Sequence, residues 1–408
     1  MRRTAWRLLV AASLIAVAGA ATRPHYGGTL HLQTRERTAP RDLVFDPLVT
    51  FDELARPRAA LAVAWKHDAD FKRWEFQLRP RVKFHDGTPL TGAVAAAALE
   101  GFGATAQGDT VVIRSEASAP NLLQKISGVA ISKRTAEGAL IGTGPFRAGE
   151  GAVFQANEDY WGGRPYLDAV EIQTGRSLRD QAQDFDLNKA DVVELGVGDT
   201  RRATQGGKRL STSVPVALIA LGFDASTEEK VREAIALSID RTAIHTVLLQ
   251  RQGVPAGSIL PQWLSGYAFL FSTARDLDKA RLLASASPVT IGYDPADATA
   301  RLIVERIAVN AREAGLLIRP TSGGQTAGRI LRVNVSTPDP TQALAAIGDT
   351  LGVHPAGTLF EVEREMLQSH RIVPLFHLPE IYGLGARVRG WAPSRWGEWK
   401  LDSVWLTP

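Results

Sequence analysis

The sequence predicts an α/β protein of two lobes, with lobe I at residues 21–214, lobe II at 215–371 and a C-terminal return to lobe I at 372–408. A chain of 408 residues with 45% hydrophobic side chains is long enough to fill two cores. The first part shows short alternating strands, the middle shows strands and helices in turn, and the tail returns to short strands and aromatic residues. This order predicts a doubly wound lobe II inserted into an α+β lobe I.

The first twenty residues have the pattern of an export signal. They contain three arginines, an apolar run at 8–17 and the small residues AGA at 18–20. We expect a signal peptide here and a mature protein in a bacterial periplasm. The chain has no cysteine, which predicts neither disulfides nor a lipid anchor at the cleavage site. Without residues 1–20 the chain carries 44 basic and 43 acidic side chains, a balance that does not favour a nucleic-acid partner.

Lobe I is expected to start with a strand at 29–33, where leucines alternate with polar residues. A longer alternation covers 74–78 and resumes at 82–84, after a proline. The dipeptide Asp86-Gly87 predicts a turn, and Thr91 is in position to cap the alanine-rich helix that follows.

Lobe II is expected to start with a strand buried on both faces, because residues 214–224 form an almost continuous apolar run. A helix is expected over 230–249, where apolar residues recur every four positions. A strand at 289–293, a helix around 302–311 and strands at 316–322 and 330–336 follow. Right-handed crossover predicts a mainly parallel sheet with helices on its faces. The insertion of lobe II requires at least two crossings between the lobes, an architecture that suits hinge closure around a ligand.

Catalytic motifs are not found in the sequence. His85 and Asp86 are adjacent, but neighbouring strand residues point to opposite faces, so turn formation by Asp86 is favoured over a catalytic pair. The other histidines are scattered and show no metal-ligand spacing, and no nucleophile motif or phosphate-binding loop occurs. We therefore expect no catalytic residue, no metal ligand, no cofactor and no enzymatic activity.

Several stretches lie in the order found in one known family. They are GGTLHL, VKFHDGTPLTG, IGTGPFR, NEDYWGGRPYLDAVEI, VREAIALSIDRTAI and RIVPLFHLPEIYGL. Together they resemble the solute-binding proteins of dipeptide, oligopeptide and nickel ABC importers, the bacterial extracellular solute-binding protein family 5. The resemblance implies a two-lobed periplasmic-binding-protein fold of type II-like architecture. The region 92–142 is shorter than in most members, so the extra subdomain of lobe I is expected to be reduced.

The resemblance also implies a function. The expected protein is a monomeric periplasmic receptor that captures peptides or peptide-like solutes between its lobes and delivers them to an ABC permease in the inner membrane. Two alternatives stay open. The same fold could bind a metal chelate, haem or a sugar-derived solute, or the protein could be a signalling or scaffold derivative that has lost transport.

One departure from the family concerns the ligand's α-ammonium. In peptide-binding relatives, an Asp before a D/E-P dipeptide in lobe II pairs with this group, whereas here Ser336 stands at the expected position. A serine cannot supply the charge that a buried ammonium requires. Asp339 would serve only if the loop shifts, and its simpler role is to form the turn with Pro340.

Six residues are expected as ligand contacts. Thr34 and Arg35 follow the first strand, where relatives run past the ligand, although a solvated loop is an equal alternative. Ser336 and Thr337 follow a lobe II strand, at the end where open α/β sheets bind ligands. Phe376 and His377 lie near the predicted return crossing and could face either the core or the cleft.

Overall fold

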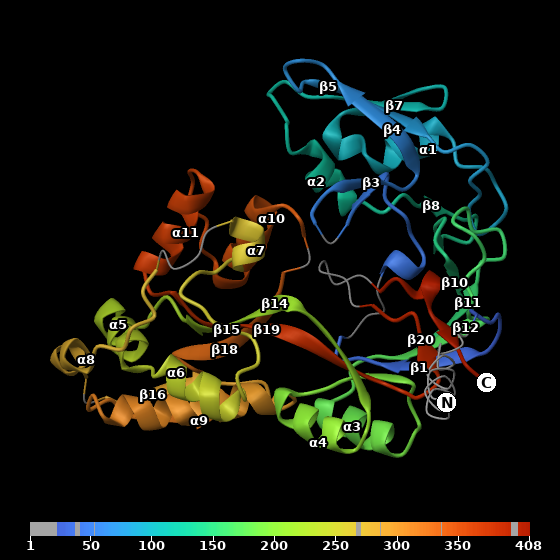
Figure 1. The fold of residues 1–408 in the computed structure, drawn as a ribbon. Helices are drawn as coiled ribbons and strands as arrows, with labels where there is room; N and C mark the ends of the chain where they lie inside the picture. The colour runs from blue at the N-terminus through green and yellow to red at the C-terminus, as the bar shows by residue number, and fades with distance from the viewer. Residues whose placement is uncertain are drawn as a thin grey trace, which may run out of the picture.

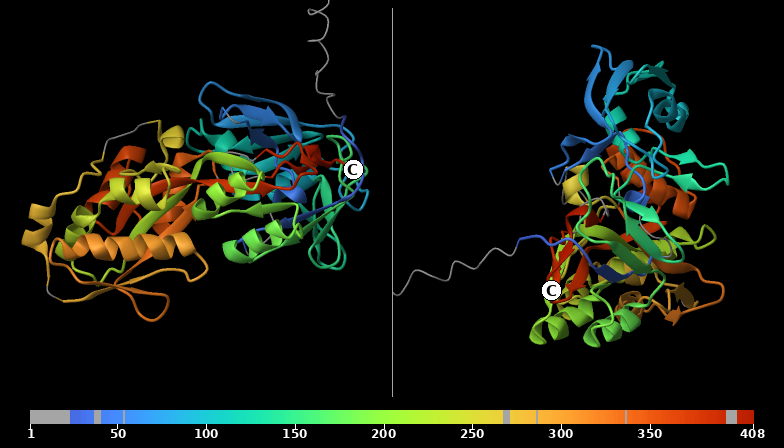
Figure 2. Two further views of the ribbon diagram at one scale, coloured as in Figure 1. Left: turned by 60° about the horizontal axis from the view of Figure 1, so that its bottom comes forward. Right: turned by 90° about the vertical axis from the view of Figure 1, so that its right-hand side faces the viewer.

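In the computed structural model, the described residues are 23–36, 41–52, 54–266, 271–285, 287–335, 337–392 and 399–408. The predicted signal peptide at 1–20 and the predicted contact Ser336 lie outside these residues. The chain forms two lobes along one large sheet, and a small subdomain stands on lobe I (Figure 1). Figure 2 shows from a second side that lobe II and lobe I lie end to end.

The large sheet has eleven strands and extends through both lobes. Its order is β10-β11-β12-β1-β13-β19-β14-β18-β16-β17, and β15 pairs with β19 outside this path. Its lobe I strands are β1 (Thr29–Gln33), β10 (Phe146–Ala148), β11 (Val153–Ala156), β12 (Ala169–Gln173) and β13 (Val192–Glu194). Strand β1 runs parallel to both β12 and β13, so the carboxyl ends of these three strands share one edge. The predicted strand at 29–33 is confirmed.

Lobe II contributes β15 (Val254–Pro255), β16 (Val289–Gly292), β17 (Ile318–Thr321) and β18 (Gly328–Asn334). Strand β16 is parallel to β17 and β18. The strands β14 (Arg209–Phe223) and β19 (Ile372–Leu384) are antiparallel to each other, and β18 is antiparallel to β14. The predicted mainly parallel sheet is therefore wrong, because β14 enters lobe II and β19 leaves it, so the two must run in opposite directions.

Strands β14 and β19 connect the two lobes. The start of β14, Arg209–Thr212, pairs with the end of β19 in lobe I, and Ala217–Phe223 pairs with β18 in lobe II. The register shifts around Pro215, which lies opposite Pro379. Because proline has no N–H to donate, the ladder is interrupted where the lobes meet. The two predicted crossings are thus one irregular two-stranded ribbon.

Helices cover both faces of the lobe II sheet. One face packs α5 (Glu229–Ser238), α8 (Leu277–Leu283) and α9 (Ala298–Arg312). The other packs α7 (Gln262–Ser265), α10 (Pro340–Leu351) and α11 (Leu359–Gln368). The core on the first face continues into lobe I, where it includes residues of α3 (Leu178–Asp186) and α4 (Thr200–Gln205). In Figure 1, α3 and α9 lie on the same side of the sheet.

The helix predicted over 230–249 is interrupted. Helix α5 ends at Ser238, and Asp240 caps the short α6 (Arg241–Ala243) by accepting a hydrogen bond from the backbone N–H of Ala243 at 2.8 Å. A π-helical turn, Ile244–Leu248, follows. The four-residue repeat persists through the break because the apolar side chains on both sides contact the same core.

The subdomain of lobe I has its own core. Its sheet has the order β4-β5-β7-β6, with β4 (Ala62–His67), β5 (Arg73–Leu78), β6 (Ala104–Gln107) and β7 (Thr110–Arg114). It also contains α1 (Gly92–Ala98), α2 (Leu122–Ser127), and the short pairs β2 (Val49–Phe51) with β3 (Pro57–Ala59) and β8 (Lys133–Arg134) with β9 (Leu140–Ile141). Thr91 caps α1, as predicted. The chain ends with the pair β20 (Val388–Arg389) and β21 (Trp405–Leu406) in lobe I.

Candidate functional site

The candidate site is a crevice between the lobes, at the carboxyl ends of their parallel strands. The segment after β1 (35–36) and the segment after β12 (175–177) line it from lobe I, and 293–297 and 329–332 line it from lobe II. The cavity has a volume of about 620 Å³. Open α/β sheets bind ligands outside the carboxyl ends of their strands, so this crevice has the position expected of a ligand site.

Four charged side chains form a chain of alternating sign across the crevice, hereafter the charge chain: Glu194, Arg35, Asp297 and Arg332. The Nε of Arg35 donates to Glu194 Oε2 at 2.9 Å, and its Nη1 lies 4.0 Å from Asp297 Oδ2. The Nε of Arg332 donates to the same Asp297 oxygen at 2.8 Å. Arg35 and Glu194 come from lobe I, and Asp297 and Arg332 from lobe II, so the charge chain links the lobes.

The ion pairs of the charge chain determine the direction in which the pKa values of Asp297 and Arg35 shift. Burial alone would raise the pKa of Asp297, but Arg332, the backbone N–H of Ala300 and Arg35 together hold it below its ordinary value. Burial opposes the charge on Arg35, yet Glu194 and Asp297 outweigh it and raise the pKa of the guanidinium. Asp297 also caps α9, so the positive end of a 15-residue helix stabilises its carboxylate. Asp297 and Arg35 are therefore charged at neutral pH.

Glu380 lies beside the charge chain on β19. Its Oε1 accepts from Asn334 Nδ2 at 3.0 Å, and its Oε2 accepts from the Tyr382 hydroxyl at 2.6 Å. Its backbone N–H donates to Ser213 Oγ on β14 at 2.9 Å. Burial raises the pKa of Glu380, and Glu194 adds to the rise by repulsion. Burial also holds the pKa of Tyr382 well above its ordinary value, so this phenol stays protonated and donates.

Of the predicted contacts Thr34 and Arg35, only Arg35 lines this crevice, and Thr34 lies buried behind it. The hydroxyl of Thr34 is fully buried and donates to Glu194 Oε1 at 2.6 Å, so it orients that carboxylate rather than facing a ligand directly. Arg35 lines the cavity. The solvated-loop alternative does not describe these two residues.

The predicted contact Thr337 lies at the start of α10. Its hydroxyl accepts from the backbone N–H of Asp339 at 3.2 Å. Asp339 in turn caps α10 by accepting from the backbone N–H of Thr341 at 2.9 Å, and only 2% of Asp339 is exposed. The sequence suggested a turn with Pro340 for Asp339, and the structure shows a helix cap, which is likewise a structural role.

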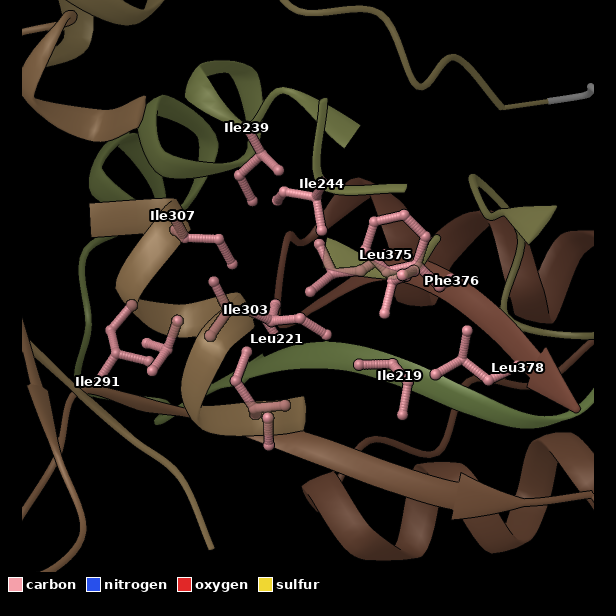
Figure 3. Close-up of a cluster of buried hydrophobic side chains, with 14 of the residues drawn as sticks. Ile219, Leu221, Ile239, Ile244, Ile291, Ile303, Ile307, Leu375, Phe376 and Leu378 are labelled. Carbon is pink, nitrogen blue, oxygen red and sulfur yellow. The ribbon is translucent and has the colours of Figure 1, made fainter. Parts of the chain in front are cut away.

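Phe376 and His377 are in the core of lobe II and not on the crevice. Phe376 is fully buried among the side chains shown in Figure 3, which include Ile219, Leu375 and Leu378. His377 is 3% exposed, and its Nε2 lies 3.0 Å from the carbonyl oxygen of Ile259. Of the two placements that the sequence left open, the structure shows the core, because β19 is central in the sheet and covered on both faces.

The His85–Asp86 pair has a structural role. His85 Nε2 lies 3.0 Å from the Gly144 carbonyl oxygen, whereas Asp86 accepts from the backbone N–H of Thr88 at 3.0 Å and pairs with Lys133 at 2.7 Å. Burial lowers the pKa of His85, and Lys133 and Thr88 lower that of Asp86 to about 2 despite partial burial. The two side chains have separate partners, as the turn prediction requires.

Sequence reasoning missed Glu194, Asp297, Arg332 and Glu380. A signal existed for Asp297, because it follows the predicted strand at 289–293 just as Ser336 and Thr337 follow theirs. For Glu194 and Glu380 no local pattern marks the residue, since each sits singly in an apolar strand and acquires its surroundings from distant segments.

The described part of the chain has neither a metal-binding cluster nor a membrane-spanning helix. No group of three or more His, Cys, Asp or Glu side chains there is arranged to hold a metal ion. Among the described helices, none has the length and apolar character that crossing a membrane requires.

The fold and the crevice define the class of two-lobed binding proteins. Comparison with family models narrows this class: the description "Bacterial extracellular solute-binding proteins, family 5 Middle" matches residues 56–110 and 103–315. The chain belongs to the bacterial extracellular solute-binding proteins of family 5.

Among curated relatives, the chain is 27% identical over 299 residues to the nickel-binding periplasmic protein of Escherichia coli (strain K12), a match that covers 60% of this chain and 56% of that protein. It is 29% identical over 126 residues to the oligopeptide-binding protein AppA of Bacillus subtilis (strain 168), covering 28% of this chain and 23% of AppA. The matched part thus spans about half or less of the length of these relatives.

Solved structures share the fold over nearly the whole chain. NikA from Staphylococcus aureus, in complex with Ni(L-His)2, has a TM-score of 0.78 and 15% identity, covering 90% of this chain and 97% of NikA. AppA from Bacillus subtilis, in complex with a nonapeptide, has a TM-score of 0.76 and 13% identity, covering 95% of this chain and all of AppA. The predicted two-lobed binding-protein fold is confirmed.

Proposed function

We propose that the protein is the substrate-binding component of an ABC importer, and that it captures peptides or peptide-like solutes in the inter-lobe crevice. The observation that carries this proposal is the charge chain, because charged groups of both lobes meet around a cavity of about 620 Å³. Cavities of about 300–1,000 Å³ with a few convergent polar groups are typical of small-molecule sites. Membership of a family of solute-binding proteins supports the same function.

Ligand capture would use lobe closure. The ribbon of β14 and β19 connects the lobes, and its ladder is interrupted at Pro215 and Pro379. Such a ribbon suits a hinge, and a ligand held by both lobes stabilises the closed form by its differential affinity for that form. An extended peptide offers backbone donors and acceptors to the strand ends, which permits broad side-chain tolerance when water fills the remaining space.

The proposed setting is a bacterial periplasm, where the loaded protein, as a monomer, would meet a permease of the inner membrane. The signal-like segment at 1–20 supports export. The printed descriptions of the relatives, a nickel-binding periplasmic protein and an oligopeptide-binding protein, support transport of a small solute. No catalytic step is part of the proposal.

A nickel chelate is the second candidate cargo. The curated relative with the longest match given above is a nickel-binding periplasmic protein, and the S. aureus structure holds Ni(L-His)2. The charge chain would then contact the carboxylates and amines of the organic ligand around the metal.

Native mass spectrometry of the protein purified without denaturation tests which cargo is bound. A co-purifying peptide is the expected result. Thermal unfolding with a library of di- to pentapeptides, and separately with Ni²⁺ plus L-histidine, provides the second test: a ligand at 100 times its Kd stabilises the folded state by about 2.7 kcal/mol. If no peptide raises the Tm and only Ni²⁺ with histidine does, the peptide proposal fails and the nickel candidate replaces it.

A further inference from the structure

A second cavity, hereafter the distal cavity, lies at the end of lobe II that points away from lobe I. Helices α5 and α11 stand at this end (Figure 1), and they line the cavity together with the segment at 271–274 and the first residues of β19. Its volume is about 510 Å³, and none of the described residues lines both this cavity and the crevice. Strand β19 runs from Ile372 at the distal cavity to Glu380 beside the crevice, so at about 3.3 Å per residue the two lie about 25 Å apart.

Arg241, which lines the distal cavity, carries a buried charge. Only 7% of the residue is exposed. Its Nε and Nη2 both donate to one neutral oxygen, the Pro374 carbonyl, at 3.1 and 2.9 Å. Within the described part of the chain, no carboxylate forms an ion pair with the guanidinium, and its Nη1 has no hydrogen-bond partner. Burial lowers the pKa of Arg241 to about 10. A buried charge is costly unless an opposite charge accompanies it, so the site favours the arrival of an anion.

A second buried arginine shows the contacts that a structural role requires. Arg232 is 8% exposed, and each of its three guanidinium nitrogens donates to a backbone carbonyl, of Thr227 or Ser369. Glu229 also attracts its charge. Arg241 differs because it uses two nitrogens on one oxygen, has no described acid beside it and lines a cavity. Its backbone contact therefore accounts for only part of its donor capacity, and Nη1 remains for a ligand.

Two more polar side chains line the distal cavity. Arg364, on α11, is exposed, and its Cζ lies 5.4 Å from the ring centre of Phe360. Glu361 attracts Arg364 but is engaged by Thr358 in the capping box of α11. Nδ1 of His370 is buried and has no hydrogen-bond partner in the described part of the chain. The described lining thus contains two arginines and a histidine but no Asp or Glu, and its charge complements an anion.

Most of the remaining lining is apolar. The rings of Phe271 and Phe360 stack, with 6.1 Å between their centres and 17° between their planes. Leu237, Leu367 and Ile372 add aliphatic surface. The volume of about 510 Å³ lies within the range of about 300–1,000 Å³ that is typical of small-molecule sites. A molecule that matches these walls has an apolar body and a negatively charged head.

We propose that the distal cavity is a second ligand site, which binds a small carboxylate with an apolar body. The guanidinium groups of Arg241 and Arg364 receive the carboxylate, since the planar donors of arginine match its two oxygens. The apolar body packs against Phe271 and Phe360. This site goes beyond the proposed function, because it does not depend on the nature of the cargo. Since it lies outside the crevice, both sites can be occupied at once.

The test measures the binding of three carboxylates, phenylacetate, indoleacetate and isocaproate, to the wild type by isothermal titration calorimetry. We expect saturable binding of at least one of them to a single site. The amide of that compound should bind about thirty-fold or more weakly, as is typical when one partner of a buried charge pair is lost. Acetate should bind at least about tenfold more weakly, because it has no apolar body to bury.

Variants of the lining locate the site. Ala274→Trp, at an exposed position, fills the cavity and should abolish binding of the best carboxylate. Arg364→Gln removes an exposed charge and should weaken binding several-fold, and Arg241→Gln should weaken it about thirty-fold or more. Arg301→Gln, which breaks an exposed ion pair on α9 outside the cavity, is the matched control and should bind as the wild type. If Arg241→Gln does not fold, Ala274→Trp and Arg364→Gln decide, because both change exposed positions.

The other outcomes overturn the proposal. If none of the three carboxylates binds saturably, or if Ala274→Trp binds as the wild type does, the distal cavity is not a carboxylate site. Equal affinity for the amide would show that the cavity selects apolar bodies and not anions. Equal affinity for acetate would show that the arginines attract anions without selecting an apolar body. None of these results bears on the crevice, whose cargo is identified separately by native mass spectrometry.

Discussion

Two groups of charged side chains in this protein look alike in chemistry and differ in organisation. The turn at Phe84–Thr88 gathers its groups from one short segment and Lys133, and the Asp86 side chain is 35% exposed. The charge chain gathers Arg35, Glu194, Asp297 and Arg332 from segments that are far apart, and the exposed fraction of each side chain is 9–22%. The turn is conspicuous in the sequence, and the charge chain is conspicuous only in the fold.

The two groups differ in the free energy that is needed to remove their charges from water. An exposed pair such as Asp86 with Lys133 gains little, because water solvates each partner nearly as well. A buried pair is costly to desolvate and tolerable only when every partner is present. A protein that keeps such a group at the junction of two lobes, next to a cavity, has a use for charge there.

The largest expected effect comes from removing one partner of the charge chain. Arg332→Met would leave the carboxylate of Asp297 buried without its closest cation, and we expect a loss of about 3 kcal/mol in the free energy of unfolding at pH 7. Chemical denaturation measures this loss. Arg301→Met, which breaks an exposed pair with Glu305 on the same helix, should change the stability by less than about 0.5 kcal/mol.

The same variant should change the pH dependence of stability. The pKa of Asp297 is lowered in the folded protein, so its contribution is present above the unfolded value of about 3.9 and is lost as the pH falls through the folded value. In Arg332→Met this acid-side loss should shrink. If Arg332→Met and Arg301→Met were equally stable at pH 7, the ion pairs of the charge chain would contribute no more to stability than an exposed pair. The contrast between the charge chain and the turn would then be wrong.

A smaller effect concerns a buried base that has no charged partner. Burial lowers the pKa of His377 to about 4. The unfolded state, with a pKa of about 6.5, binds a proton first as the pH falls, so the folded state should lose about 1.4 kcal/mol per pH unit from this residue between pH 6.5 and 4. His377→Gln keeps a donor for the Ile259 carbonyl and should remove this slope. Urea titrations at several pH values measure it, and an unchanged slope in the variant would assign the pH dependence to other groups.

More of the fold than of the candidate site could be predicted from the sequence. Alternation predicted the strand at 29–33, turn chemistry explained Asp86, and cap chemistry predicted Thr91, because each of these features is set by neighbouring residues. The order of strand and helix patterns along the chain predicted two lobes, and the family motifs pointed to the same arrangement. The strand directions in lobe II were predicted wrongly, because they depend on β14 and β19 crossing between the lobes in opposite directions, which is a property of the whole chain.

The site was predicted only in part because its residues are defined by contacts over long distances. Arg35 follows a strand, was predicted from that position and lines the crevice, whereas its partners Glu194 and Asp297 lie 159 and more residues away in the chain. Phe376 and His377 were placed near a crossing correctly, but their side chains face the core, since an almost unbroken apolar strand gives no alternation from which to choose a face.

The smallest expected effect is at the turn, and it completes the contrast. Asp86→Asn keeps an oxygen that accepts from Thr88 but removes the charge that pairs with Lys133. We expect a loss of at most about 1 kcal/mol in the free energy of unfolding, which added salt reduces further. Ligand affinity should not change, because the turn lies in the subdomain and lines none of the cavities of the crevice. Chemical denaturation at two salt concentrations and titration with the library's best peptide measure both quantities. A loss of affinity in Asp86→Asn with stability intact would move the functional site toward the turn, and burial of charge would no longer distinguish the two regions.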